Sequence, residues 1–185
     1  MKIKQYFPVS VIAGIVASLY TGFAVFFGLN AIWVAFISWP MHLMAGGKPK
    51  RLHKAVFGLT GGMILAWLML LLSGPLTAFF SLPVALGIIV FFFTIIIVML
   101  ELTEWFEMAG AYFLSFAGFL AYVFGGFGGP AAFTNPTVAL LPYWLLLMLG
   151  LVLASIISFL RKVILEKQGI FGAAQQTVFD KEKPE

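Results

Sequence analysis

Long apolar stretches, divided by short breaks rich in glycine, proline or charged residues, make up most of this chain of 185 residues. Lys and Arg occur in only three clusters, at positions 2–4, 48–54 and 161–183, and the sequence between these clusters is apolar. A membrane-spanning helix needs about 20 mainly apolar residues, and a charged side chain at the bilayer centre costs about 2.5–3.5 kcal/mol. The pattern therefore predicts six transmembrane helices, at residues 7–28, 31–45, 55–73, 77–100, 108–124 and 138–160.

The predicted fold class is an all-α membrane protein with one six-helix transmembrane domain, residues 1–162, and a cytoplasmic tail, residues 163–185. The composition agrees, because the chain is 62% hydrophobic and only 10% charged, whereas soluble domains have about 25% charged residues. The net charge of +4 is attributed to lysines on the cytoplasmic side, so we expect no nucleic-acid partner. The chain has no cysteine, which excludes disulfides, thiolate metal sites and cysteine nucleophiles.

The positions of the basic clusters also predict an orientation. Cytoplasmic loops carry an excess of Lys and Arg. With a cytoplasmic N-terminus, six crossings put all three clusters on the cytoplasmic side, whereas an odd number of crossings would place one cluster outside. We therefore expect a multi-pass protein whose two termini are both cytoplasmic. The outer connections, at residues 74–76 and 126–136, carry no charge.

The two halves of the chain resemble each other. Residues 31–38 lead into Gly46-Gly47, and residues 111–118 lead into Gly125-Gly126, so a short aromatic span ending in two glycines lies in the middle of each half. Three spans per half is an odd number, which would make the halves inverted repeats. Transporters built in this way bind their solute at interrupted or short spans near the membrane midplane. Chance similarity between two phenylalanine-rich segments is the alternative.

The predicted spans contain no Asp, Glu, Lys or Arg, and proton-coupled transporters usually need such residues as relays. This absence favours passive passage of a small neutral solute. The candidate pore-lining or solute-contact residues are Trp33, Phe36, Ser38, Pro40, His42, Tyr112, Phe113 and Ser115. Pro40 removes a backbone donor in its span, and His42 is the only histidine within a span. The alternative for His42 is a role in helix packing.

Three glutamates, Glu101, Glu104 and Glu107, follow the fourth predicted span at intervals of three. This spacing predicts a broadly shared helix face, and a cytoplasmic vestibule that attracts cations is one interpretation. The other is a solvated helix end that pairs loosely with basic residues of the 48–54 cluster. No ligand spacing supports a metal site, so we expect neither a metal nor a cofactor.

Small residues recur four positions apart in several spans. Gly14, Ser18 and Gly22 form one such stripe, and Gly58 and Gly62 form another. In lipid, faces of this kind allow close contact between helices. They predict either packing within one subunit or a contact between subunits of a homo-oligomer.

The glycine-rich segment at residues 125–137 lies on the predicted outer side. Thr134 or Asn135 is expected to cap the sixth helix, with Pro136 in its first turn. The segment is uncharged, so it is also a candidate for re-entry into the membrane, where non-helical backbone is tolerated if it lines a cavity.

The segment from Trp33 to Trp39, running on to Gly46-Gly47-Lys48-Pro49, resembles a family of small bacterial inner-membrane proteins grouped as domain of unknown function ten-ninety-seven. The resemblance covers residues 7–160. It implies a location in the bacterial inner membrane, and it implies no mechanism and no catalytic residue.

These observations lead to two hypotheses. The first is a channel or facilitator for a small neutral solute, working as a homo-oligomer in the lipid bilayer. The second is a non-transporting membrane scaffold or accessory subunit of a membrane complex. We expect no enzymatic activity, because the pattern contains no pairing of a nucleophile with a base.

Overall fold

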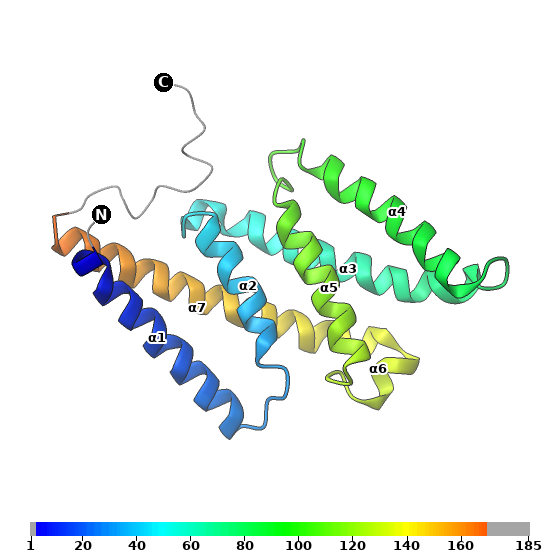
Figure 1. Cartoon of the computed structure of the whole chain (residues 1–185), viewed down its shortest axis with the longest axis horizontal. Coiled ribbons are helices and arrows are strands. Elements are labelled where there is room, and N and C mark those ends of the chain that lie inside the picture. The colour runs from blue at the N-terminus through cyan, green and yellow to red at the C-terminus, as the bar shows by residue number, and fades with distance from the viewer. Residues whose placement is uncertain (1–2, 170–185) are drawn as a thin grey trace. The chain divides into compact units, whose positions relative to one another are not determined.

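The computed structural model describes residues 3–169, with side chains from Phe7 onward, and this range is all-helical (Figure 1). The elements in order are α1 (Ile3–Phe26), α2 (Trp33–Met44), the 3-10 turn η1 (Pro49–Arg51), α3 (Leu52–Leu76), α4 (Leu82–Leu100), α5 (Ala109–Phe124), α6 (Pro130–Thr134), the 3-10 turn η2 (Pro136–Ala139) and α7 (Leu140–Lys167). Of the predicted tail, the structure describes residues 163–169, which complete α7 and the turn after it. The remainder of that tail lies outside the described residues.

Four helical stretches are long and apolar enough to cross a membrane: Phe7–Phe26, Pro49–Leu76, Leu82–Leu100 and Pro136–Lys167. These helices identify the chain as an integral membrane protein. The helices at the second and fifth predicted spans are shorter, because α2 has 12 residues and α5 has 16. At about 1.5 Å per residue, straight helices of these lengths are shorter than the hydrocarbon core of about 30 Å.

The connection between the third and fourth predicted spans differs from the expectation. Residues 74–76 form the last turn of α3, and the chain leaves the helix only at residues 77–81. Pro75 lacks a backbone donor, but side chains bond carbonyls in this turn: Ser73 Oγ donates to the Leu70 carbonyl (2.8 Å) and Thr77 Oγ1 donates to the Gly74 carbonyl (2.6 Å). Pro75 thus lies within the last turn of α3 and does not end the helix.

The chain divides into two compact units. Unit 1 consists of residues 1–52 and 148–185, and in its described part it contains α1, α2, η1 and α7 from Met148 onward. Unit 2 consists of residues 53–147 and contains α3 beyond its first residue, α4, α5, α6, η2 and the beginning of α7. The third helix of the chain thus belongs to a different unit from the two helices before it.

In unit 1, α2 packs against both α1 and α7. Trp39 of α2 forms a core with Ala154 and Ile157 of α7, and partly buried residues of α1 cover this core. The Tyr20 hydroxyl of α1 donates a hydrogen bond to the Ile32 carbonyl just before α2 (2.9 Å). This bond and this core fix the short helix between the two long ones.

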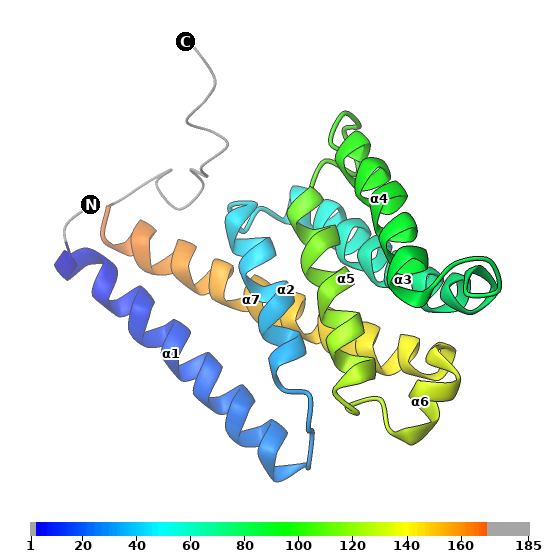
Figure 2. The same ribbon diagram turned by 45° about the vertical axis from the view of Figure 1, so that its right-hand side comes forward.

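In unit 2, α3 and α4 form a hairpin, and α5 crosses α3 (Figure 2). Ile97 of α4 packs with Ala109 and Tyr112 of α5, and Leu65 of α3 covers the same cluster. Each unit therefore places one short helix against two long ones.

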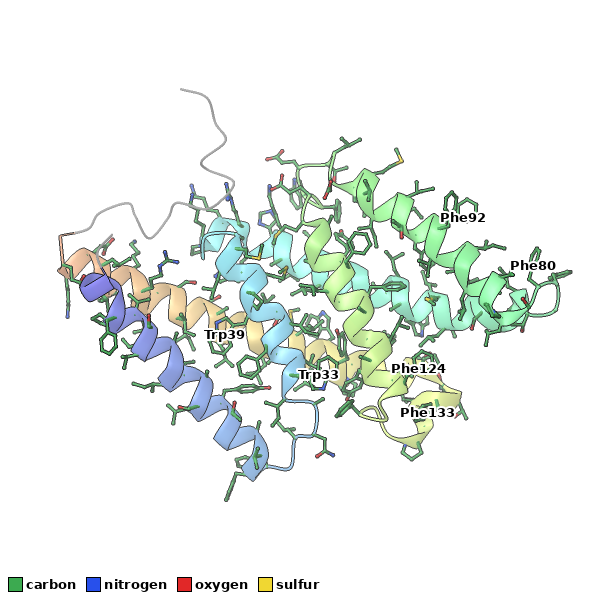
Figure 3. The ribbon with its side chains drawn as sticks, in the orientation of Figure 1. Trp33, Trp39, Phe80, Phe92, Phe124 and Phe133 are labelled. Carbon is green, nitrogen blue, oxygen red and sulfur yellow. The ribbon has the colours of Figure 1, made fainter. Side chains whose placement is uncertain are left out.

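Large apolar side chains on the outer faces are exposed, as expected for a surface in contact with lipid. Phe80 and Phe92, at the α3–α4 turn and on α4, are 47% and 57% exposed, and Phe124 and Phe133 are 62% and 55% exposed (Figure 3). In water such a surface would be a liability, whereas a bilayer accepts it.

Candidate functional site

The candidate residues on α2 divide between two faces of that helix. Ser38 and His42, one turn apart, are fully buried in unit 1, and the Ser38 hydroxyl donates to the Ala35 carbonyl (3.1 Å). Phe36 and Pro40 lie on the exposed face, where Phe36 stacks on Trp39 with ring centroids 5.4 Å apart. The buried face of α2 therefore carries the polar groups.

Trp33, at the start of α2, is partly buried. Figure 3 shows it at the first turn of the helix, apart from the more deeply buried Trp39 further along α2. The two indoles thus lie at successive levels of the same short helix.

The buried face of α2 contacts α7 at a glycine. A side chain at Gly150 would collide with the Ala35 carbonyl and with Ser38 Oγ, so only glycine permits this approach of the two helices. Further along, Gly47 lies against Ser158, and its φ of +61° also favours glycine. Small residues at such crossings are typical of helix contacts in membranes.

His42 faces Ser155 of α7 across this contact. Its Nε2 lies 3.5 Å from Ser155 Oγ, and that hydroxyl donates to the Leu151 carbonyl at 2.8 Å. His42 is only 1% exposed, and its Nδ1 has no hydrogen-bond partner among the described residues. Unpaired polar atoms are uncommon in protein interiors, where water or a ligand often supplies the missing partner.

In unit 2, α5 contacts α3 at several glycines. A side chain at Gly62 would collide with the backbone of Tyr112, and one at Gly61 would collide with the Tyr112 ring. At Gly58, an added Cβ would lie 2.7 Å from the Ala111 Cβ. The Gly58–Gly62 stripe therefore packs within the chain, as one of its two predicted roles requires.

Ser115 lies on the same buried face of α5 as Tyr112. Its carbonyl accepts a hydrogen bond from the buried Tyr143 hydroxyl at the start of α7 (3.1 Å), while its own Oγ is buried without a partner among the described residues. Phe113, by contrast, is 41% exposed on the other side of α5. Each short helix thus buries a polar side chain that has one atom without a hydrogen-bond partner among the described residues.

Two indole hydrogen bonds tie α3 to η2 and to the beginning of α7. Trp67 Nε1 donates to Thr137 Oγ1 in η2 (3.1 Å), and Trp144 Nε1 donates to Thr60 Oγ1 (3.0 Å). These bonds hold the end of the glycine-rich segment and the beginning of α7 against α3.

The predicted cap at this point is confirmed for one of the two candidates. Asn135 Oδ1 accepts from the Thr137 amide (3.2 Å), with Pro136 at the first position of η2, and η2 leads directly into α7. Thr134 instead ends the short helix α6, where its hydroxyl donates to the Ala131 carbonyl.

The prediction that the three glutamates share a helix face is wrong. The α4 helix ends at Leu100, and residues 101–108 form turns, so Glu101 and Glu104 are exposed without a common helix. The Thr103 hydroxyl donates to the Leu100 carbonyl (2.7 Å) at the point where the helix ends. Glu107 forms an ion pair with Lys54 of α3 (2.7 Å), which is one of the pairings expected from the sequence.

The stripe on α1 differs from the stripe on α3. A Cβ added at Gly14 or Gly22 would meet no atom within 4 Å in the described part of the chain. Ser18 between them is exposed, and its hydroxyl donates to the Ile15 carbonyl of its own helix. This face of α1 is therefore open.

Sequence reasoning missed Gly150, Ser155 and Tyr143, which complete the surroundings of the two short helices. Ser155 lies five residues after Gly150, and Ser158 follows, so a run of small residues inside an apolar helix was the available signal. Tyr143 carried no comparable signal, because an aromatic residue near a predicted span end is commonly an interfacial residue.

Comparison with known proteins supplies a family. The family model described as "Protein of unknown function (DUF1097)" matches residues 10–162, which is most of the chain and agrees with the resemblance found in the sequence. No curated protein and no solved structure matches the chain significantly.

Proposed function

Because the chain belongs to the DUF1097 family of proteins of unknown function, which assigns it no activity, we propose a function from the arrangement of its own polar groups. The protein is a channel or facilitator that lets a small neutral solute cross the membrane passively. The observation that carries this proposal is that two buried atoms of the short helices, His42 Nδ1 on α2 and Ser115 Oγ on α5, have no hydrogen-bond partner among the described residues.

An unpaired polar group inside an apolar bundle is costly, since burying it without a hydrogen bond costs about 1–3 kcal/mol on the scale of protein mutations. Water or a solute at these positions removes that cost. The groups are a neutral imidazole or hydroxyl, not a carboxylate or ammonium, so they favour a partner that hydrogen-bonds without carrying charge. The lack of charged relays in the predicted spans argues in the same direction.

For the membrane topology we propose six crossings with both termini in the cytoplasm of a bacterial cell. The support is the distribution of Lys and Arg. The short helices α2 and α5 are the two crossings that need a test, because as straight helices they reach across only part of the bilayer. Reporter fusions after residue 48 and after residue 167 test this topology. Cytoplasmic-reporter activity at both positions is expected, and periplasmic activity at either one contradicts it.

The transport proposal is tested by stopped-flow light scattering on proteoliposomes, with water, glycerol, urea and acetamide as solutes. Faster relaxation than in empty liposomes is expected for at least one solute. Rates equal to those of empty liposomes for the whole panel contradict the proposal.

A cysteine-accessibility measurement gives an independent readout, because the chain has no native cysteine. Ser115→Cys introduces a single thiol at a fully buried position, and Ser18→Cys introduces a matched thiol on the open face of α1. Thiolates react with methanethiosulfonates far better than thiols, so a thiol reached by water reacts quickly and one in lipid does not. We expect Ser115→Cys to react and to lose solute flux, and Ser18→Cys to react slowly without such a loss.

A second candidate function is that of a non-transporting accessory subunit, favoured by the open stripe of Gly14, Ser18 and Gly22 on α1. In a homo-oligomeric channel the same stripe is the contact between subunits. Gly14→Ile and Gly22→Ile, counted by single-molecule photobleaching in nanodiscs, separate these functions. Conversion of a wild-type oligomer to monomers supports the homo-oligomer, whereas a monomeric wild type that copurifies with a second membrane protein supports the accessory subunit.

A further inference from the structure

The two long helices that occur third in each half, α3 and α7, have matching patterns of burial. When the two sequences are aligned with Gly62 matched to Gly150, every buried position of α3 between residues 55 and 69 except Gly58 matches a buried position of α7. Gly58 matches Leu146, which is partly buried. The pairs are Ala55 with Tyr143, Leu59 with Leu147, Met63 with Leu151, Ala66 with Ala154, and Met69 with Ile157. Exposed positions also coincide, as in Ile64 with Val152 and Leu71 with Phe159.

The short helices match in the same way. When Ser38 is aligned with Ser115, both fully buried, most of the buried residues again coincide, and exposed Phe36 matches exposed Phe113. Not every pair coincides, because buried Trp39 matches partly buried Phe116 and buried Ala109 matches partly buried Ile32. The other buried pairs are Val34 with Ala111, Ala35 with Tyr112, Met41 with Gly118, His42 with Phe119, and Ala45 with Tyr122. In this alignment Phe36-Ile37-Ser38 matches Phe113-Leu114-Ser115, whereas the two glycine pairs, Gly46-Gly47 and Gly125-Gly126, are offset by two positions.

Burial alone could coincide between any two helices of similar phase, but the contacts also correspond. In unit 1 the glycine of α7, Gly150, lies against the carbonyl of Ala35, and in unit 2 the glycine of α3, Gly62, lies against the carbonyl of Tyr112. Ala35 and Tyr112 are equivalent positions in the placement above. The same approach of helix to helix therefore occurs once in each unit.

The core clusters correspond at four of their five residues. Unit 1 joins Tyr20, Ala35, Ile32 and Leu153, and unit 2 joins Ile97, Tyr112, Ala109 and Leu65. The fifth residues, Ala24 in unit 1 and Leu100 in unit 2, are not equivalent. In the same placements, Ala35 and Leu153 are equivalent to Tyr112 and Leu65. The spacing that relates α2 to α5 also relates Tyr20 on α1 to Ile97 on α4. Each unit thus contains the first two helices of one half and most of the third helix of the other half.

The equivalence also shows where the units differ. His42 of α2 corresponds to Phe119 of α5, and its neighbour Ser155 of α7 corresponds to Trp67 of α3. Phe119 packs edge-on against Tyr143, with ring centroids 5.3 Å apart, and leaves no polar atom at this position. We infer that the units are copies of one three-helix module that have exchanged their third helices, and that His42 with Ser155 forms a solute-recognition site which unit 2 has replaced with aromatic residues.

The hydrogen bonds around His42 define the class of solute. The Ser155 hydroxyl directs its proton to the Leu151 carbonyl, so towards His42 it can only accept. A neutral imidazole has one donor and one acceptor nitrogen. Nε2 is then the donor, and the unpaired Nδ1 is an acceptor. The site is built for a small neutral molecule that donates a hydrogen bond, such as an amide, urea, an alcohol or water.

This inference rests on the proposed transport function, and its test uses three substitutions of one residue in the full-length protein in proteoliposomes. His42→Phe installs the residue of the equivalent position, His42→Asn keeps an acceptor near the place of Nδ1, and His42→Gln places its amide near Nε2. Flux of the transported solute is expected to fall about tenfold in His42→Phe and His42→Gln, the factor given by about 1.4 kcal/mol of lost hydrogen bonding. His42→Asn is expected to retain most of it.

Phe119→Leu is the matched control, because it changes the equivalent buried position of unit 2 and is expected to leave the ratio of solute rates unchanged. Wild-type flux in His42→Phe, in protein that is folded by circular dichroism, overturns the inference while the transport function stands. Equal losses in His42→Phe, His42→Asn and Phe119→Leu also overturn it, since they indicate packing damage alone.

A binding measurement separates the site from transport. The chain has two histidines, so His53→Gln leaves His42 as the only imidazole for ¹⁵N NMR. Acetamide and acetone have similar size, but only acetamide donates a hydrogen bond. A shift of the Nδ1 signal with acetamide and not with acetone supports the site even if no flux is found, and equal responses to the two probes, or none, overturn it.

Discussion

Replacing Gly150 by alanine tests whether α2 and α7 approach each other as closely in unit 1 as the structure indicates. The added methyl would collide with the Ala35 carbonyl and with Ser38 Oγ. Overpacking typically costs about 1–3 kcal/mol. Because one obstacle is a backbone carbonyl, which cannot rotate away as a flexible side chain can, we expect a cost of about 3 kcal/mol.

Alanine also favours the helix over glycine by about 1 kcal/mol, so the expected net destabilisation is about 2 kcal/mol. Gly14→Ala is the matched control, since it lies in a helix and its Cβ would meet nothing within 4 Å in the described part of the chain. It has only the helical gain, about 1 kcal/mol of stabilisation. The two substitutions should therefore differ by about 3 kcal/mol in the free energy of unfolding.

The assay is unfolding by sodium dodecyl sulfate in mixed micelles, followed by tryptophan fluorescence and circular dichroism. Gly62→Ala is expected to behave like Gly150→Ala, because its methyl would collide with the Tyr112 backbone. Equal unfolding midpoints for Gly150→Ala and Gly14→Ala would refute the close contact of α2 with α7, and with it the surroundings described for His42.

Further substitutions test three single contacts in unit 2. Tyr143→Phe removes the hydrogen bond to the Ser115 carbonyl and should cost about 1 kcal/mol in the same unfolding assay; an unchanged midpoint contradicts this bond. Lys54→Gln and Glu107→Gln, combined in a double-mutant cycle, should give a coupling energy below about 1 kcal/mol that disappears in high salt, because the Glu107 side chain is 46% exposed. A coupling energy that does not change with salt contradicts a surface ion pair. Asn135→Ala should cost about 1 kcal/mol through loss of the cap, and Asn135→Asp should cost little; equal losses in both show that the side-chain oxygen is not what matters.

The sequence by itself determined the class of the protein and the positions of most of its helices. Apolar length depends only on local composition, so it identified the apolar helices without knowledge of any contact. Four of these helices are long enough to cross a membrane. Asn135 was one of two predicted caps for the same reason, because its partner is the amide two residues later. The resemblance around Gly46-Gly47-Lys48-Pro49 likewise identified the family that the comparison then matched.

Local rules were less reliable where a proline, or a regular spacing of charged residues, is compatible with more than one structure. Pro75 was expected to end its helix, yet the last turn of α3 accommodates it. The spacing of Glu101, Glu104 and Glu107 suits a helix face, but α4 ends at Leu100 before them. In both places the turn geometry decided the result.

Only the tertiary structure decided which helices are partners. In water, the apolar face of an amphipathic helix indicates where it packs, but a helix in lipid is apolar on every side and gives no such signal. Partners are chosen by close packing and by hydrogen bonds between residues far apart in the chain. Gly150 against Ala35, Gly62 against Tyr112, and His42 beside Ser155 are contacts of this kind. They join α2 to α7 and α5 to α3, pairings that no local pattern contains.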